Sequence, residues 1–430
     1  MESTIISTKT ANEAPTKERW IIVGVLMITL LVAYLDRVNV AVLLADNVFL
    51  TDMGIKGQPV QMGLLMTLFL IAYGIGNVVL SPVGDLLGPR KAMSLSIILW
   101  ALSLCMGGIA ATFTTMLVAR FVLGLGEGIH WPMQSKYVKN WFPPSERGKA
   151  NAWWALGLMI GPAITMPVLT WIVQSFGWRE SFFVLMALGL IPLLLLWFRT
   201  TDHPKQHKKV NAAELDLIEK GLKEEAEKEA HVSKSSLWDS MKTFIFSYRF
   251  WLLTLYYLCH CSVWWGTMAW LPSYLKVARG FSWAEMGAWA TLPYIIGAIF
   301  VLVSGWLSDR VGRRAPFSVF SLCMAAICIY GAAYVESNNT SAILISFGIG
   351  AIAIGVPCAW SLAQEIIPAN AVGAGSGMMN GLANGGSAFA PVLIGLAISV
   401  SGGYVGGLMF LVGSAVAGAI CIGILALKGH

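Results

Sequence analysis

The sequence predicts an all-α membrane protein whose twelve transmembrane helices form two pseudo-symmetric six-helix halves. Three observations lead to this prediction. The chain of 430 residues is 57% hydrophobic, it is only 12% charged, and its apolar residues gather into twelve long segments. Soluble domains carry roughly 25% charged residues, whereas about 20 mainly apolar residues suffice for a helix to cross a bilayer.

The first half is expected to comprise residues 1–198. Its first apolar run is too long for the core of a cleavable signal peptide and continues into two charged residues, so we expect it to remain as a span. The six spans predicted here are residues 20–44, 61–80, 92–110, 115–137, 150–173 and 181–198.

A hydrophilic block at residues 199–249 separates the halves, and its centre, rich in Glu and Lys, predicts a solvated surface helix in a cytoplasmic linker. The second half is expected to comprise residues 250–430. Its six predicted spans are residues 250–275, 283–306, 315–335, 341–366, 373–399 and 404–427.

Lysine and arginine concentrate on one side of the predicted spans. The opposite side holds only Lys56, Arg179, Lys276 and Arg279. Because basic loops stay in the cytoplasm, this asymmetry predicts that both termini are cytoplasmic. The net charge of +6 follows from this topology and gives no reason to expect nucleic acid as a partner.

Four ionisable residues interrupt the apolar spans of the first half: Asp36, Arg37, Arg120 and Glu127. A charge at the centre of a membrane helix costs about 2.5–3.5 kcal/mol even on insertion scales, so such residues are expected to face a partner or a polar cavity. Two acids and two bases together predict a site that binds an anion and handles a proton. The alternative is a buried network that only fixes packing.

Each of these residues has an expected role. Arginine stays charged and can hold both oxygens of a carboxylate, so Arg37 is the predicted anion site. Burial and a nearby arginine change the proton affinity of an acid, so Glu127 is the predicted coupling acid, with Arg120 as its partner and Asp36 as a second candidate. His130 either shares this proton pathway or is a hydrogen-bonded histidine of the bundle.

The two halves repeat a short loop. Asp85 and Arg90 follow the second span, and Asp309, Arg310 and Arg313 follow the eighth. Internal repetition of this kind is typical of transporters built from two related halves.

The second copy, residues 305–314, resembles the signature loop of the major facilitator superfamily, and the first copy is a degraded version of it. Residues 34–39, 120–128, 141–148 and 176–179 are similar to patterns of the anion:cation symporter group of that superfamily. The resemblance covers essentially the whole chain. It implies the major facilitator fold, a bacterial inner-membrane location, and proton-coupled uptake of an organic acid, as in galactonate and hexuronate carriers; sialin is an animal relative.

The resemblance also implies roles for particular positions. The acids of the first and fourth helices would be protonated, and Tyr73, Trp360 and Asn380 or Asn384 would line the substrate cavity. The two repeated loops are expected to join the halves in the outward-open state. A monomer is sufficient for this mechanism, and we expect no cofactor, no metal and no enzymatic activity.

The sequence leaves the substrate open. Residues 155–159 of the fifth span are apolar, where sugar-acid carriers offer a polar amide, and this favours an aromatic or short-chain carboxylate over a sugar acid. An organophosphate:phosphate antiporter is a further alternative, although its dianionic substrate calls for basic residues that the seventh span lacks. A drug exporter and a non-transporting receptor are weaker alternatives.

Overall fold

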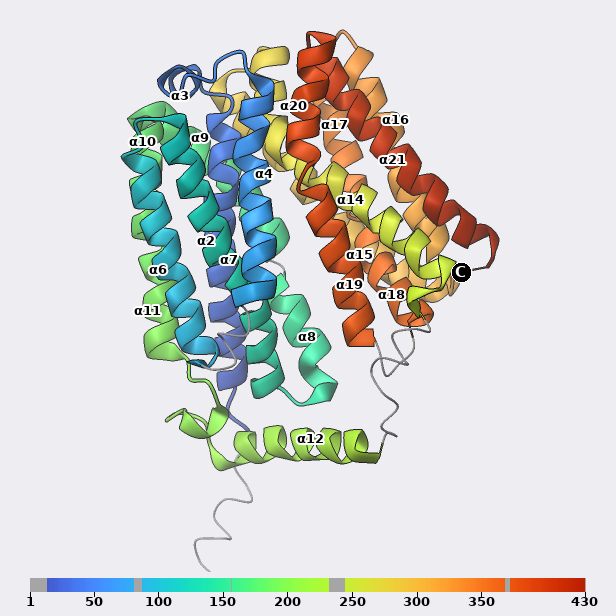
Figure 1. Cartoon of the computed structure of the whole chain (residues 1–430). Helices are drawn as coiled ribbons and strands as arrows, with labels where there is room; N and C mark the ends of the chain where they lie inside the picture. The colour runs from blue at the N-terminus through green and yellow to red at the C-terminus, as the bar shows by residue number, and fades with distance from the viewer. Residues whose placement is uncertain (1–13, 81–86, 156, 232–243, 368–371, 430) are drawn as a thin grey trace, which may run out of the picture.

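A computed structural model of the chain describes residues 14–80, 87–155, 157–231, 244–367 and 372–429. Within these ranges the chain forms helices joined by short loops, without a β-strand. The helices pack into two groups that correspond to the first and second halves of the sequence (Figure 1).

The first group consists of the helices up to residue 199. Its long members run between the two ends of the bundle, and α3 is a short helix in a connecting loop. The helices are α2 (Glu18–Leu43), α3 (Asn47–Asp52), α4 (Pro59–Ile75) with the π-helical turn η1 (Gly76–Leu80), α6 (Pro89–Gly108), α7 (Phe113–Trp141), α8 (Pro144–Ala155), α9 (Gly157–Phe176), α10 (Trp178–Leu188) and α11 (Leu190–Arg199).

The second group begins after the linker, which holds the turn η2 (Pro204–Gln206) and helix α12 (Ala212–His231). Its helices are α14 (Tyr248–Ser273) with the π-helical turn η3 (Tyr274–Ala278), α15 (Trp283–Val311), α16 (Ala315–Tyr334), α17 (Asn338–Ile352), α18 (Gly355–Ile366), α19 (Val372–Ser387), α20 (Ala390–Ser401) and α21 (Tyr404–Leu427).

The twelve predicted spans correspond in order to these helices, which confirms the predicted fold class. Eight helical stretches are long and apolar enough to cross a membrane by those two properties alone. Several spans are divided into two helices, as at Gly189 between α10 and α11 and ahead of Pro391 near the start of α20. Proline lacks the amide hydrogen that a continuous helix needs, so such breaks are expected near it.

The two halves meet at the end of the bundle away from α12. Gly63 of α4 lies so close to α20 that a Cβ there would stand 2.4 Å from the Pro391 carbonyl oxygen, and a Cβ on Gly395 would stand 2.2 Å from that of Pro59. Thr291 of α15 donates to the Ala163 carbonyl of α9 at 3.1 Å. In Figure 1 the ribbons of the halves approach one another at this end and separate towards α12.

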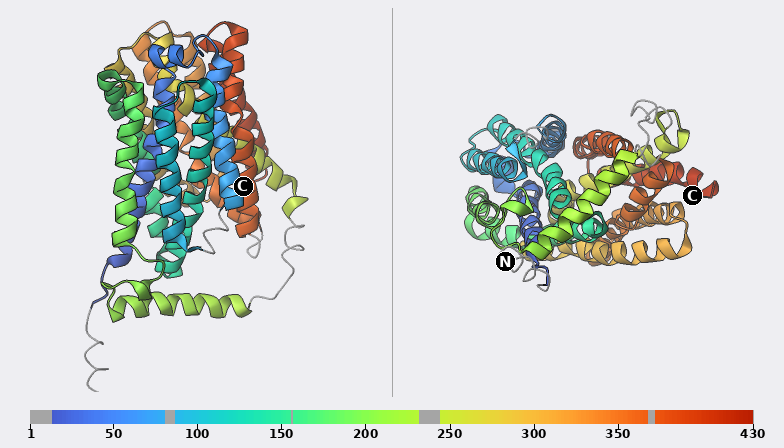
Figure 2. Two further views of the ribbon diagram at one scale, coloured as in Figure 1. Left: turned by 60° about the vertical axis from the view of Figure 1, so that its left-hand side comes forward. Right: turned by 90° about the horizontal axis from the view of Figure 1, so that it is seen from below.

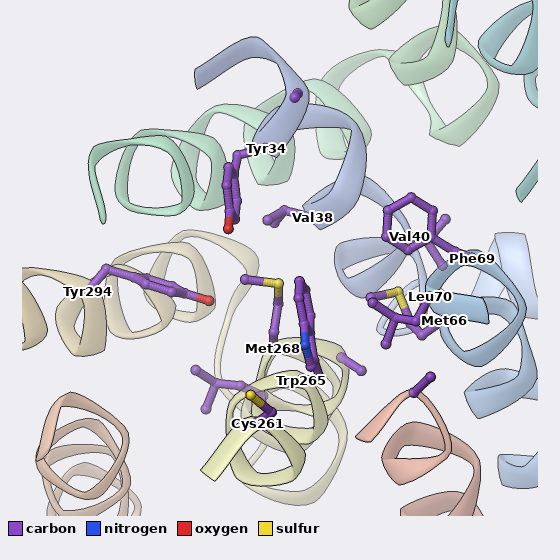
Figure 3. Close-up of a cluster of buried hydrophobic side chains, with 14 of the residues drawn as sticks. Tyr34, Val38, Val40, Met66, Phe69, Leu70, Cys261, Trp265, Met268 and Tyr294 are labelled. Carbon is purple, nitrogen blue, oxygen red and sulfur yellow. The ribbon is translucent and has the colours of Figure 1, made fainter. Parts of the chain in front are cut away.

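A layer of apolar and aromatic side chains from both halves lies between them. Figure 3 shows Tyr34 of α2 and Met66 of α4 on one side, and Trp265 of α14 and Tyr294 of α15 on the other. All four are buried. The interface at this level is therefore formed by side chains, whereas the glycine contacts above bring backbone against backbone.

Helix α12 lies across the opposite end of the bundle and is attached to the first half (Figures 1 and 2). Arg19, at the start of α2, forms ion pairs with Glu214 of α12 at 2.8 Å and with Glu146 of α8 at 2.9 Å. Thr16 donates to the same Glu214 carboxylate. The Glu214 side chain is fully buried, so the linker begins with a fixed attachment.

Candidate functional site

A buried ion pair joins two helices of the first half. The Arg37 Nε of α2 donates to Glu127 Oε2 of α7. The exposed fraction is 4% for Arg37 and 0% for Glu127, so water does not screen this pair. The second carboxylate oxygen of Glu127 has no hydrogen-bond partner among the residues that the structure describes.

Two tyrosine rings flank the guanidinium of Arg37. Its Cζ lies 4.9 Å from the centroid of the Tyr34 ring and 5.0 Å from that of Tyr73. Cations are attracted to aromatic faces at such distances. The two tyrosine rings therefore give the Arg37 guanidinium contacts in addition to its carboxylate partner.

Glycines of α7 bring Tyr73 to this position. A Cβ on Gly124 would stand 2.4 Å from the Phe69 carbonyl oxygen of α4, and one on Gly128 would stand 2.5 Å from that of Tyr73. Small residues let membrane helices approach this closely. This close approach at Gly124 and Gly128 places α4 against the ion pair.

The expected pairing of Glu127 with Arg120 is not the one that the structure contains. Arg120 is 2% exposed, lies 4.5 Å above the Phe69 ring, and donates to the backbone carbonyls of Leu65 and Asp36 at 3.4 Å each. Seven residues of helix separate Arg120 from Glu127 by about 10.5 Å. Helical side chains lean towards the N-terminus, so Arg120 leans away from Glu127.

Asp36, the second acid, is also buried, with 2% of its surface exposed. Its Oδ1 has no hydrogen-bond partner among the described residues. The structure therefore places all four predicted charged residues inside the first half, but connects only Arg37 and Glu127 by a salt bridge.

His130 lies one turn beyond Glu127 on α7. Its Nε2 is 3.0 Å from Nε2 of Gln134, whose amide also donates to the Leu26 carbonyl of α2. The His130 ring packs 5.0 Å from that of Trp100. Sequence reasoning did not single out Gln134, although Glu127, His130 and Gln134 follow the three- and four-residue spacing of one helix face.

The second half contributes uncharged groups. Nε1 of Trp265 donates to the amide oxygen of Asn384 at 3.2 Å, and the Asn384 amide donates to Oδ1 of Asn380 at 2.9 Å. The two asparagines are one turn apart on α19. Trp360 of α18 packs edge-on against Tyr257 of α14, with ring centroids 5.9 Å apart.

The predicted gating residues whose side chains the structure describes, Arg90, Arg310 and Arg313, lie away from this site. Asp85 and the side chain of Asp309 lie outside the described residues. Leu156, in the apolar part of the fifth span, lies outside them too. Arg90 contacts its own half and the start of the linker: its guanidinium donates to the Trp197 carbonyl and lies over the Trp197 ring, and its backbone nitrogen donates to Asp202. Arg310 and Arg313 are exposed at the end of α15. The expected contacts between the two loops belong to the outward-open state and stay a prediction.

Comparison with known proteins gives consistent matches over nearly the full length. The sequence profile of the Major Facilitator Superfamily matches residues 26–391. A probable sulfoacetate transporter of Cupriavidus necator is 31% identical over 94% of this chain and 92% of its own. A probable galactarate/D-glucarate transporter of Bacillus subtilis is 31% identical over 94% and 90%, and a D-galactonate transporter of Escherichia coli is 25% identical over 94% and 95%.

Solved structures have the same fold. A bacterial homologue of the human lysosomal transporter Spinster, in an inward-facing and unoccupied conformation, aligns with a TM-score of 0.74 and 17% identity over 96% of each chain. A D-xylose-proton symporter aligns with a TM-score of 0.73 and 16% identity over 93% of this chain and 96% of its own. At these identities the likeness concerns the fold alone.

Proposed function

This chain belongs to the Major Facilitator Superfamily and is a multi-pass membrane protein, and on that premise we propose that it is a secondary active transporter that takes up a small organic anion together with protons. The observation that supports this most directly is the buried ion pair of Arg37 and Glu127. Intramembrane ionisable groups are functional by default, and this pair offers one cation for an anion and one acid for a proton.

The proposed coupling is a competition for Arg37. While Glu127 is ionised, its carboxylate is paired with the Arg37 guanidinium. When Glu127 takes up a proton its negative charge is lost, and the substrate carboxylate replaces it as the partner of Arg37. Tyr34 and Tyr73 hold the guanidinium during this exchange. Because linkage is reciprocal, protonation of Glu127 tightens anion binding and the bound anion favours the protonated acid.

The named relatives support an organic acid as substrate. Galactonate is a monocarboxylate, galactarate and glucarate are dicarboxylates, and sulfoacetate carries a sulfonate and a carboxylate. A sugar acid is the leading candidate, and an aromatic or short-chain carboxylate is the alternative that the apolar fifth span favours. Asn380, Asn384 and Trp360 are proposed to contact the uncharged part of this substrate.

The proposed transport cycle alternates between two contact patterns of the halves. The present contacts, at the end away from α12, would close one side of the membrane. In the opposite state those contacts would open, and the loops around Asp85 and Asp309 would meet. We place α12 and both termini in the cytoplasm and the protein in a bacterial inner membrane, as a monomer.

Uptake by proteoliposomes tests the proposal. Purified protein is reconstituted, a proton gradient directed inwards is imposed, and accumulation of radiolabelled galactonate, glucuronate, benzoate and succinate is measured. We expect at least one acid to accumulate in a way that a protonophore abolishes and that protein-free liposomes do not show. Uptake that ignores the protonophore but follows a sodium gradient would refute proton coupling, and the absence of uptake of every acid would refute organic anion transport.

A phosphate-ester antiporter is the second candidate, but the second half provides no cation within its spans. Its lysines and arginines from residue 250 onwards all lie at helix ends or in loops, at Lys276, Arg279, Arg310, Arg313, Arg314 and Lys428. Exchange of a sugar phosphate for inorganic phosphate in the same proteoliposomes, without any effect of the proton gradient, would favour this alternative.

A further inference from the structure

The two sides of the proposed site, called its walls below, differ in charge. The first half contributes Arg37 to the first wall, and the second half contributes Asn380 and Asn384 to the second. On the first wall, Arg37 is the cation that the proposed proton exchange releases. Arg120 lies against the Phe69 ring and donates to the carbonyls of Leu65 and Asp36. Protonation of Glu127 removes one negative charge from beside Arg37, and one negative charge on the substrate would replace it.

The second wall offers hydrogen bonds without charge. Asn384 accepts from Trp265 and donates to Asn380, and both asparagines are half-buried. The buried polar residues that the structure describes in this half are serines, threonines and His260; none of them is Lys, Arg, Asp or Glu. His260 stacks on Tyr257 and lies against Gly355 of α18, so it packs within its own half.

The two walls are connected through the layer of side chains between the halves. Tyr34, whose ring contacts Arg37, faces Tyr294 and Trp265 in Figure 3. Trp265 in turn holds Asn384. Contacts thus lead from Arg37 to Tyr34 on one side and from Trp265 to Asn384 on the other, and the proposed ligand would lie between these two pairs.

We infer that the transported anion carries a single negative charge, bound by Arg37, and an uncharged polar end that faces Asn380 and Asn384. This inference rests on the proposed function. A dianion would bring its second charge to a wall without a cation, and an ionised group removed from water without a partner is strongly disfavoured. The amides can instead donate to and accept from hydroxyl or carbonyl groups.

Ligands that share a carbon skeleton but differ in charge test the inference. Galactitol, galactonate and galactarate have the same six carbons with no, one and two carboxyl groups. Two further matched pairs are 4-methylbenzoate with terephthalate and butanoate with succinate. Binding to the full chain in nanodiscs is measured by thermal shift at neutral pH, where the carboxyl groups of the ligands are ionised. We expect a monoanion to bind at least about tenfold more tightly than its matched dianion, and more tightly than the uncharged analogue.

The possible outcomes separate the inference from the function on which it rests. A dianion that binds as tightly as its matched monoanion, or more tightly, would overturn the inference and leave organic anion transport intact. No binding by any monoanion or dianion would overturn both.

A cation introduced into the second wall provides an independent test. Asn384→Arg is expected to reverse the preference, so that the dianion of a pair binds about tenfold more tightly than the monoanion. Asn384→Gln, which keeps the amide, is the matched control and is expected to retain the preference for the monoanion. If Asn384→Arg does not fold, Asn380→Lys places a cation one turn away. An unchanged preference in a folded variant would show that this wall does not face the second end of the ligand, which would overturn the inference.

Discussion

The two halves of this transporter share a plan of six helices but differ in what they bury. The first half buries Asp36, Arg37, Arg120 and Glu127, whereas every lysine and arginine of the second half lies at a helix end or in a loop. Pseudo-symmetry therefore extends to the helices and not to their polar chemistry. In a protein built from two related halves, one half can therefore contain the buried charged groups while the other contributes uncharged, hydrogen-bonding groups.

The contacts between the halves, in contrast, follow the symmetry. The second span meets the eleventh through Gly63 and Gly395, and the fifth meets the eighth through Thr291 and Gly287, where a Cβ would stand 3.2 Å from Pro167 Cα. Corresponding helices of each half are used in both contacts. The chemistry of the halves is thus asymmetric, while the interface that must open and close is nearly symmetric.

The largest effect is expected from removing Arg37, the cation of the first half that is proposed to bind the anion. Arg37→Ala leaves Glu127 buried without its partner, and breaking a buried pair costs about 3–5 kcal/mol of stability. We expect both a large loss of thermal stability and the loss of anion binding. In Arg37→Ala/Glu127→Gln the stability is expected to return but the binding is not. Binding by the folded double variant would mean that the four charged residues only fix packing.

Neutralising the acid separates coupling from binding. Glu127→Gln is nearly isosteric and releases Arg37 permanently, so we expect proton-driven accumulation to disappear while counterflow exchange of the same anion continues. Uptake rates in proteoliposomes over a range of pH, with and without a gradient, provide the measurement. Concentrative uptake at the wild-type level would remove Glu127 from the coupling mechanism.

A methyl group added at Gly63 tests the second part of the comparison, the nearly symmetric contacts between the halves. Gly63→Ala would bring a Cβ to 2.4 Å from the Pro391 carbonyl oxygen, a backbone atom that cannot rotate away. Overpacking of this kind costs about 1–3 kcal/mol, so the population is expected to shift towards the opposite state. Distances between spin labels on the loops at the two ends report this shift.

Gly381→Ala is the matched control for Gly63→Ala, since a Cβ at Gly381 meets nothing within 4 Å. We expect it to leave the distances unchanged. Equal shifts in both variants would indicate a general effect of alanine on membrane helices rather than a clash at the interface.

The smallest effect is expected from the uncharged wall. Asn384→Ala removes neutral hydrogen bonds, each of which contributes about 0.5–1.5 kcal/mol net, so affinity is expected to fall up to about tenfold with proton coupling intact. Titration of the leading ligand, together with the pH dependence of its uptake, measures both quantities. Loss of coupling in this variant would contradict the division of roles between the halves.

The sequence predicted the helices because a membrane span depends on local composition. Twelve apolar segments became twelve helical spans, and the burial of Asp36, Arg37, Arg120 and Glu127 follows from their position within them. The helix breaks were less predictable. A span divides near Pro192 at Gly189, whereas α7 and α14 continue through Pro132 and Pro272, so a proline alone does not predict a break.

The pairing of charges could not be predicted from spacing. Arg120 and Glu127 share a face of α7, yet Glu127 meets Arg37, because its partner is determined by how α2 crosses α7. Tyr34 was missed as a contact of Arg37, although three residues of helix place the two on one side. The bond between Trp265 and Asn384 joins residues more than a hundred positions apart and left no local signal.

The attachment of α12 has a consequence for the order in which the protein assembles during synthesis. Thr16 and Arg19, which bind Glu214, and Glu146, the second partner of Arg19, all precede α12 in the chain. Once residue 214 has left the ribosome, each of these contacts can form before any helix of the second half exists. The linker can therefore be anchored to the first half before the helices of the second half are synthesised.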